Sequence, residues 1–309
     1  MLEIKELSVS FKRYETDASA FAAGLKQKDL HVINNLSVLV RKGEITAIAG
    51  SSGSGKSLLA HAILGILPAN ANVSGDMLYC GQVLTTEKLK ALRGREIALV
   101  PQSVAWLDPL MRVGKQVVGI NGTVEKQRAV FSRYGLDVSV DRLYPFQLSG
   151  GMARRVLLST AVMEGAKLII ADEPTPGLSV DLARRAMGHF RELADAGAGV
   201  LLITHDIDLA MEFADYIAVF YAGSTLEIAP AREFREGGGA LRHPYSKALC
   251  AAIPQNGFVP IAGTQPYSGA MPEGCPFAPR CPQKNAACER SAIPMREVRG
   301  GEVRCVCAA

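Results

Sequence analysis

Apolar residues recur along the chain with two spacings, one typical of strands and one typical of helices. Residues 2–11 and 31–40 alternate apolar and polar side chains, which predicts strands with one buried face. The polar segment 13–31 predicts a surface loop or a hairpin extension. Five short runs are almost continuously apolar, as expected of strands buried on both faces of a parallel sheet: residues 44–49, 97–100, 167–171, 199–204 and 216–222.

Helical spacing fills much of the chain between these runs. Residues 56–67 and 180–194 predict helices, and residues 105–165 predict a mainly helical region. Strands that alternate with helices indicate an α/β fold with a largely parallel, helix-covered sheet.

The composition changes after Phe234. Gly237, Gly238 and Gly239 form a predicted linker, and residues 253–282 are rich in proline and glycine. We therefore expect a main domain at 1–235 and an extension at 236–309.

Composition and charge exclude several classes of protein. Hydrophobic residues make up 48% of the 309 residues, which is ample for a core. The net charge of +4 is too small to indicate binding to nucleic acid or to an anionic membrane surface. No apolar run reaches the roughly 20 residues that span a bilayer, and residues 1–5 do not open a secretory signal. The sequence predicts a cytoplasmic protein whose membrane association depends on a partner.

One glycine-rich segment predicts a phosphate site. It fits G-x-x-x-x-G-K-[ST] in full, between the predicted strand 44–49 and the predicted helix that begins at Lys56. Its residues are Gly50, Ser51, Ser52, Gly53, Ser54, Gly55, Lys56 and Ser57. Backbone N–H groups and the helix N-terminus would bind phosphate oxygens, Lys56 would neutralise them, and the Ser57 hydroxyl would bind Mg²⁺. The segment indicates a nucleoside triphosphate without indicating what its hydrolysis drives.

Two acids end the predicted strand 167–171. A carboxylate at the carboxyl edge of a parallel strand reaches the same crevice as the phosphate loop. We expect Asp172 to hold Mg²⁺ and Glu173 to orient or deprotonate the attacking water. His205 follows the predicted strand 199–204 and is the third polar group expected at that edge.

A second helix start narrows the class of ATPase. Leu148-Ser149-Gly150-Gly151-Met152 precedes a predicted helix at 153–165, so Ser149, Gly150 and Gly151 form a second anion-binding turn. The segment resembles the ABC ATPase signature, which faces the γ-phosphate bound by the opposite subunit. The resemblance covers residues 1–235 and implies an ABC-type P-loop core with an antiparallel N-terminal β-subdomain.

The resemblance assigns further roles. Gln102 matches the glutamine that touches Mg²⁺ and water and reports to the transmembrane partner, which makes Ser57, Gln102 and Asp172 the implied magnesium set. Phe11 falls where an aromatic ring stacks on adenine, with Tyr14 as the alternative. Residues 90–165 match the helical subdomain that docks on a permease.

Three positions depart from the family pattern. Met152 replaces glutamine in the signature, and Asp108 stands in an Asp-Pro pair where the peptide-importer branch usually has asparagine. Ser179 replaces the aspartate of the D-loop, which matches residues 178–181. The serine weakens the expectation of symmetric coupling and favours a paralogous partner subunit.

The tail adds a more specific resemblance. His243-Pro244-Tyr245 and Cys275-Pro276-Phe277 belong to segments that look like the C-terminal extension of oligopeptide, dipeptide and nickel importer ATPases. Four thiolates there would suit a [4Fe–4S] cluster or zinc, and reduced thiols are the third alternative. The four are Cys275, Cys281, Cys288 and Cys305, with Cys307 as an alternative fourth ligand.

The resemblance implies an ATP-hydrolysing importer subunit. Two such subunits would close on two ATP molecules and drive two permease subunits at the cytoplasmic face of the inner membrane. An extracytoplasmic binding protein would deliver peptides or nickel chelates. The alternatives are a soluble ABC ATPase acting on DNA or the ribosome, and an accessory ATPase of a carbon–phosphorus lyase-like complex, which the tail disfavours.

Overall fold

The structure of the chain is a computed structural model that describes residues 1–14, 27–50, 55–119, 122–163 and 165–308. These residues form two compact units. Unit 1 contains Met1, residues 40–47 and residues 85–214. Unit 2 contains residues 2–39, 48–84 and 215–309. The chain passes from one unit to the other inside strand β3 (Ile45–Gly50).

Unit 1 is built on three parallel strands. β6 (Ile97–Val100), β7 (Leu168–Asp172) and β8 (Gly199–Thr204) lie in that order, with Val100 opposite Ala171 and Asp172 opposite Ile203. All residues of β7 and β8 are buried, which explains their continuously apolar sequences. The start of β3 runs beside β8, because Val200 donates its N–H to the carbonyl of Glu44.

The helices of unit 1 follow from apolar stripes and from polar caps. In α7, Ala183, Ala186, Met187 and Phe190 recur on one face and are buried. In α5, the Thr123 side chain accepts the N–H of Lys126 and so caps the first turn. The helices are α3 (Thr86–Leu92), α4 (Val113–Val118), α5 (Val124–Arg133), α6 (Gly150–Met163), α7 (Val180–Asp195) and α8 (Ile207–Phe213).

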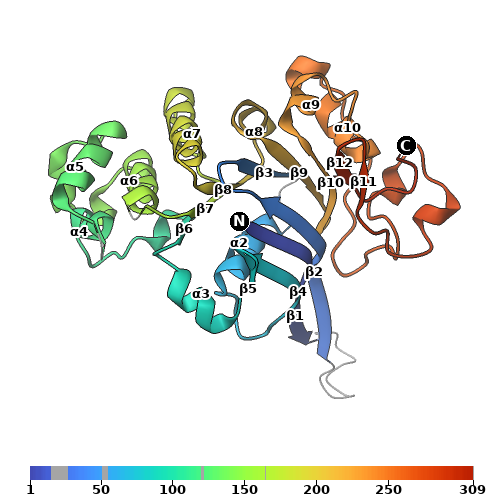
Figure 1. The fold of residues 1–309 in the computed structure, drawn as a ribbon, viewed down its shortest axis with the longest axis horizontal. Coiled ribbons are helices and arrows are strands. Elements are labelled where there is room, and N and C mark those ends of the chain that lie inside the picture. Colours follow the sequence, from blue (N-terminus) through green and yellow to red (C-terminus); the bar gives the residue numbers. More distant parts are fainter. Residues whose placement is uncertain (15–26, 51–54, 120–121, 164, 309) are drawn as a thin grey trace. The chain divides into compact units, whose positions relative to one another are not determined.

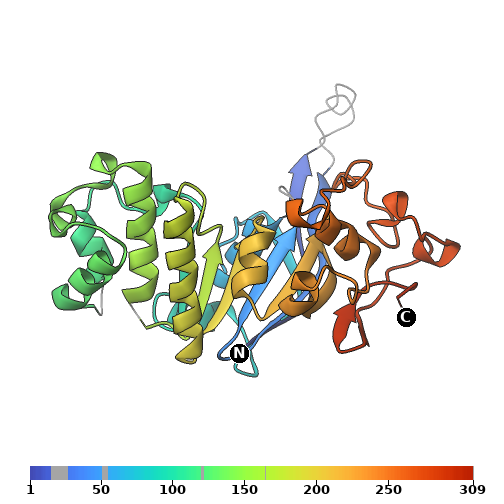
Figure 2. The same cartoon turned by 90° about the horizontal axis from the view of Figure 1, so that it is seen from above.

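Helices α4, α5 and α6 share a core of their own (Figures 1 and 2). Its members include Val113, Val117, Phe131, Val156 and Leu157, each at most 5% exposed. Full burial of one such side chain contributes roughly 1.5–3 kcal/mol, so a cluster of this size holds the three helices together. Short 3₁₀ turns interrupt this region at Val104–Trp106, Val138–Arg142 and Pro145–Gln147.

Unit 2 contains an antiparallel sheet in the order β2-β1-β4-β5. Its long pair β1·β4 places Leu2 opposite Tyr79 and Phe11 opposite Ala71, with a shift in register between Lys5 and Ser8. The strands are β1 (Leu2–Tyr14), β2 (Gln27–Val40), β4 (Ala71–Tyr79) and β5 (Gln82–Val83). The helix of this part is α2 (Lys56–Leu64).

The remaining strands of unit 2 are antiparallel and lie in the order β9-β10-β12-β11. They are β9 (Tyr216–Tyr221), β10 (Ser224–Pro230), β11 (Arg296–Val298) and β12 (Gly301–Val303). The helices are α9 (Ala231–Arg235) and α10 (Pro244–Ala251). Three 3₁₀ turns, Pro254–Asn256, Ala278–Arg280 and Ala286–Cys288, punctuate an otherwise irregular tail, coloured orange to red in Figure 2.

The predicted strands are confirmed, and the largely parallel sheet holds for β6, β7 and β8 but not for β9 to β12. The loop expected at 13–31 is shorter than predicted, because β1 extends to Tyr14 and β2 begins at Gln27. The expected boundary near residue 236 falls inside unit 2. Within the described residues, no helix is long and apolar enough to cross a membrane.

Candidate functional site

The phosphate loop belongs to unit 2, and the structure describes its two ends. Lys56 begins helix α2, and its Nζ donates a hydrogen bond of 2.9 Å to the carbonyl of Gly50. Lys56 is only 6% exposed, so its charge is held against the loop rather than extended into solvent. Ser57 lies in the same first turn. The predicted loop residues Ser51, Ser52, Gly53 and Ser54 lie outside the described residues.

Two glycines of the loop have no workable substitute. Gly50 lies so close to strand β9 that a Cβ would stand 2.1 Å from the carbonyl oxygen of Phe220. Gly55 caps α2 with φ of 90°, in the left-handed region that costs other residues about 1–2 kcal/mol. The motif therefore constrains the backbone at the two described ends of the loop.

The predicted carboxylates lie in unit 1 at the carboxyl end of β7. Asp172 is the last residue of that strand and is 3% exposed, and Glu173 follows it. His205 follows β8, and its Nδ1 lies 2.8 Å from Oε2 of Glu173. The ring nitrogen and the carboxylate oxygen are thus within hydrogen-bonding distance. The predicted meeting of Glu173 and His205 is thus present.

Glu173 has an unusual backbone. Its φ is 48°, although it is neither glycine nor asparagine, while its N–H still donates to the carbonyl of Ile203 at 2.8 Å. A left-handed conformation of this kind costs a non-glycine residue about 1–3 kcal/mol, and six other non-glycine residues among those described share it. The side chain is 8% exposed and that of His205 is 62% exposed, so the pair extends from the interior to the surface.

Gln102 leaves the neighbouring strand β6 at the same edge, with an exposed side chain. Its carbonyl accepts a 2.5 Å hydrogen bond from Nη1 of Arg154, a residue of helix α6. Arg154 also donates to Pro101 and Pro174 and is 3% exposed. Sequence reasoning did not single out Arg154, since an arginine in an amphipathic helix gives no indication that it is buried.

The signature turn starts helix α6 in unit 1. The Ser149 hydroxyl accepts the N–H of Met152 at 3.3 Å and so caps the helix, as its position before the two glycines predicts. Ser149 and Gly150 are exposed, and a Cβ at Gly150 would meet no atom within 4 Å. The first N–H groups of α6 are therefore accessible to an external anion.

The two aromatic candidates for adenine stacking lie in β1 of unit 2. Phe11 is partly buried opposite Ala71, and Tyr14 is 51% exposed. The Tyr14 hydroxyl accepts a 2.9 Å hydrogen bond from Nε2 of Gln27. This bond holds Tyr14 to the neighbouring strand and leaves Phe11 the better candidate.

The predicted magnesium ligands have suitable chemistry. Mg²⁺ prefers hard oxygen ligands, and Ser57 and Asp172 offer a hydroxyl and a buried carboxylate, while Gln102 offers an amide oxygen. Each of these groups is, by its chemistry, of the kind that binds the ion. When bound with ATP, it would supply positive charge to the phosphate oxygens.

The cysteine-rich tail does not fit the predicted metal. Among the described residues, which include all seven cysteines, no group of three or more potential ligands is arranged to hold a metal ion. The prediction of a [4Fe–4S] cluster or zinc at Cys275, Cys281, Cys288 and Cys305 is therefore unsupported.

Several of these thiols also have partners within the protein. Burial raises the pKa of Cys275 to about 11, and the Cys288 thiol contacts Oδ1 of Asn285 at 3.6 Å. The alternative ligand Cys307 donates to the carbonyl of Gln283 at 3.4 Å. Within the described residues the structure gives no support to a metal, and reduced thiols stay one of the three alternatives.

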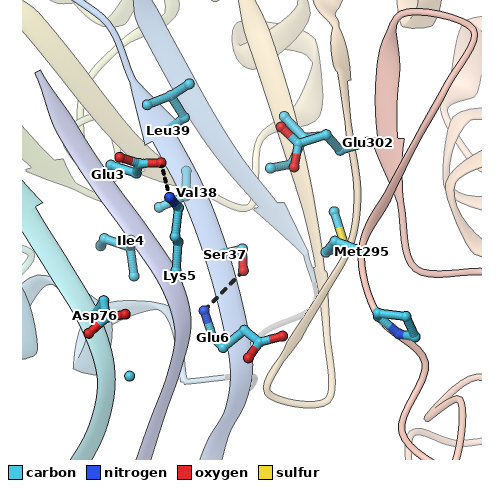
Figure 3. Close-up of a pocket in the computed structure, with 13 residues that line it drawn as sticks. Glu3, Ile4, Lys5, Glu6, Ser37, Val38, Leu39, Asp76, Met295 and Glu302 are labelled. Carbon is cyan, nitrogen blue, oxygen red and sulfur yellow. Dashed lines mark hydrogen bonds and ion pairs between the residues drawn. The ribbon is translucent and has the colours of Figure 1, made fainter.

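A separate pocket of about 410 Å³ lies in unit 2, between the N-terminal sheet and the tail (Figure 3). Glu3, Glu6, Asp76 and Glu302 line it, and Lys5 pairs with Glu3 at 2.7 Å. None of the predicted site residues belongs to its lining, so it is distinct from the nucleotide chemistry.

Comparison with known proteins agrees with these features. The family described as "ABC transporter" matches residues 33–176, and the "Oligopeptide/dipeptide transporter, C-terminal region" matches residues 226–288. The "Oligopeptide transport ATP-binding protein OppD" of Escherichia coli (strain K12) is 33% identical over 98% of this chain and 92% of its own length. The chain belongs to the oligopeptide/dipeptide family of ABC transporter ATP-binding subunits.

A second member of the family gives the same result. The "Dipeptide transport ATP-binding protein DppD" of Bacillus subtilis (strain 168) is 32% identical over 94% of this chain and 89% of its own length. The chain is accordingly the ATP-binding subunit of an ABC importer, an ATPase coupled to transport. The alternative of a non-transport accessory ATPase is not favoured.

Solved structures support the fold. The "Dimeric structure of a post-hydrolysis state of the ATP-binding cassette MJ0796 bound to ADP and Pi" has a TM-score of 0.61 and 22% identity, and covers 75% of this chain and 99% of that one. "Structure of ATP binding subunit of ABC transporter" has a TM-score of 0.61 and 20% identity, and covers 77% of this chain and 93% of that one. The chain has the fold of an ABC ATPase cassette, with mixed α/β structure and an antiparallel N-terminal sheet.

Proposed function

We propose that this importer subunit powers the uptake of peptides. The observation that carries the proposal is the likeness to peptide importers along nearly the whole chain, tail included. Its partners would be two permease subunits and an extracytoplasmic binding protein, and its place the cytoplasmic face of the inner membrane. The solute itself is chosen by those partners, so nickel chelates remain the second candidate.

The subunit would work as half of an ATP-binding dimer. The exposed N–H groups at Ser149 and Gly150 suit a γ-phosphate that is held by an opposite subunit. Ser179, which stands where the family has the D-loop aspartate, is the N-cap residue before α7, and its side chain makes no capping hydrogen bond. The departure favours a paralogue over an identical chain as the partner.

The residues of the site would divide the work of hydrolysis. Lys56 would exchange its bond to Gly50 for phosphate oxygens, and Phe11 would stack on adenine. Glu173 would orient and deprotonate the attacking water, and the Nδ1 of His205 would hold the carboxylate in place. Because phosphoryl transfer needs little covalent chemistry from the protein, positioning of these groups would account for most of the rate.

Glu173→Gln tests the assigned role of the carboxylate. We expect turnover to fall by about 10²–10⁴-fold, because an amide cannot take the proton, while ATP binding is retained. The variant should also accumulate as an ATP-bound dimer in size-exclusion chromatography. Unchanged turnover in Glu173→Gln would remove the role of Glu173.

Reconstitution with the membrane partners tests the transport proposal. The subunit, its partner subunit and the permeases are placed in vesicles with the binding protein, and ATPase rates are measured with dipeptides, oligopeptides and nickel complexes. Stimulation by peptides alone supports the proposal, and stimulation only by a nickel complex contradicts it. Analysis of the partner subunit in the same preparation separates a paralogue from a second copy.

The tail would serve the proposed transporter with its thiols reduced. The extension at 236–309 would be a structural part of unit 2, as the contacts of its arginines suggest. Iron and acid-labile sulfide are measured on anaerobically purified protein, and zinc is measured in parallel. About one cluster or one zinc ion per chain would refute the reduced state.

A further inference from the structure

Arg154 joins three parts of unit 1 that the mechanism needs. It belongs to α6, five residues after the signature serine Ser149. Its Nε donates 3.1 Å to the carbonyl of Pro174, and its Nη1 donates 2.8 Å to the carbonyl of Pro101 and 2.5 Å to that of Gln102. One planar guanidinium thus connects the signature helix to the loops that follow β6 and β7.

Those two loops carry the groups that act on water. Val100 is opposite Ala171 in the parallel pair β6·β7, so Pro101 and Asp172 are the next residues at the same edge of the sheet. Gln102 and Glu173 follow one residue later. A shift of either loop therefore moves a residue that the proposed chemistry requires.

Arg154 is buried, and one of its nitrogens is unpaired within the described residues. The side chain is 3% exposed, and its Nη2 has no hydrogen-bond partner among the described residues. A buried donor without an acceptor costs about 1–3 kcal/mol, so the fold keeps this arginine at a cost. Burial lowers the pKa of Arg154, and the carboxylates of Asp172 and Glu173 act in the opposite direction.

We propose that Arg154 is a positioning residue for ATP hydrolysis, whose guanidinium makes the signature helix, the Gln102 loop and the Glu173 loop move as one body. The inference rests on the proposed roles of Gln102 and Glu173. When a partner's nucleotide binds at the start of α6, the movement of that helix is passed through Arg154 to both loops. A lysine cannot do this, because one ammonium lacks the planar fork that reaches three carbonyls.

The test compares Arg154→Lys, Arg154→Ala and Arg154→Met in steady-state ATPase assays. We expect kcat to fall by about 10²-fold in Arg154→Met and about 10-fold in Arg154→Lys, because displacement of a positioned group by about 1 Å costs such factors. KM for ATP should stay within about twofold, because the three bonds of Arg154 do not involve Lys56. Methylguanidine added to Arg154→Ala should restore part of kcat.

Arg155 offers a matched control in the same helix. It also donates to three carbonyls, those of Tyr134, Gly135 and Gly151, and none of them belongs to the two strand-end loops. Arg155→Lys and Arg155→Ala should lower the midpoint of thermal unfolding, leave kcat within about twofold, and show no response to methylguanidine.

The outcomes separate the inference from the proposed function. If Glu173→Gln is inactive while Arg154→Lys turns over at the normal rate, the role of Arg154 is refuted and that of Glu173 stands. If Glu173→Gln turns over normally, the proposed role of Glu173, on which the inference rests, is refuted. If the Arg154 variants lose kcat only in proportion to folded protein, and methylguanidine has no effect, Arg154 is merely structural and the inference is overturned.

Discussion

Gly55 and Glu173 are two of several residues with a left-handed backbone, and they adopt it for different reasons. Gly55 adopts φ of 90° at no steric cost, because it has no Cβ, and it turns the phosphate loop into α2. Glu173 adopts φ of 48° against its own preference, because the carboxylate has to leave the end of β7 beside His205. The positive φ of Gly55 serves the fold, and we attribute that of Glu173 to its proposed chemical role.

A pair of variants at residue 173 measures this strain. Glu173→Gly and Glu173→Ala both remove the carboxylate, so both should lack ATPase activity. Glu173→Gly should nevertheless be the more stable of the two by about 1 kcal/mol in urea unfolding, because glycine adopts a positive φ without the steric cost that a Cβ brings. Equal stability would mean that residue 173 is not left-handed in solution.

Among the elements, the tail is fastened to unit 2 by arginines. Arg242 forms buried ion pairs with Glu227 and Glu233 and donates to the carbonyl of Val298 before β12. Arg304 donates to the carbonyls of Thr225, Ile293 and Asn35, and so joins the end of the chain to β10 and β2. The tail therefore completes unit 2 instead of forming a core of its own.

Arg242→Met tests this fastening. The change leaves Glu227, which is fully buried, and Glu233 without their cation, which typically destabilises a protein by about 3–5 kcal/mol. Lys284→Met is the control, because Lys284 pairs with Glu289 on the surface and such pairs contribute about 1 kcal/mol or less. Urea unfolding of both variants checks the prediction, which fails if their midpoints coincide.

At the scale of the whole molecule, each unit contains a buried histidine that must stay neutral. Burial lowers the pKa of His189 to about 4, and its Nδ1 bonds to the hydroxyl of Tyr134. Burial lowers the pKa of His243 to about 3, where its Nδ1 accepts the N–H of Tyr245 at the start of α10. At the other extreme, burial raises the pKa of Cys275 to about 11.

These shifts predict that stability falls on both sides of neutral pH. Between about pH 6.5 and 4 the unfolded chain binds more protons than the folded one, so the free energy of unfolding decreases as pH falls. Between about pH 9 and 11 the unfolded thiol of Cys275 is ionised and the folded one is not, so stability decreases as pH rises. Thermal unfolding measured from pH 4.5 to 10 checks both the acid-side and the alkaline-side decrease in stability.

The double variant His189→Gln with His243→Gln should reduce only the decrease in stability on the acid side. An unchanged decrease on the acid side would contradict the assignment to these two histidines.

Local patterns determined much of the fold and of the site. Strands β3, β6, β7 and β8 could be predicted directly from their apolar runs. A strand that is buried on both faces needs apolar side chains at nearly every position, which gives such a run. The phosphate loop, the paired acids and the signature are each made of consecutive residues. Their chemistry could therefore be predicted from short segments of the sequence. Strand β4 was missed because most of its residues are exposed and show no alternation, and β11 and β12 were missed because each has three residues.

The sequence by itself thus determined the class of ATPase and predicted the residues of its nucleotide site. Only the tertiary structure decided which distant groups meet: Glu173 with His205, Arg154 with Pro101 and Pro174, and Arg242 with Glu227. Among the described residues it gave no support to a metal arrangement of the tail cysteines, whose spacing alone allowed three interpretations. The physical reason is that periodicity reports the environment of each element, whereas contacts between elements depend on packing and on which buried polar groups find partners there.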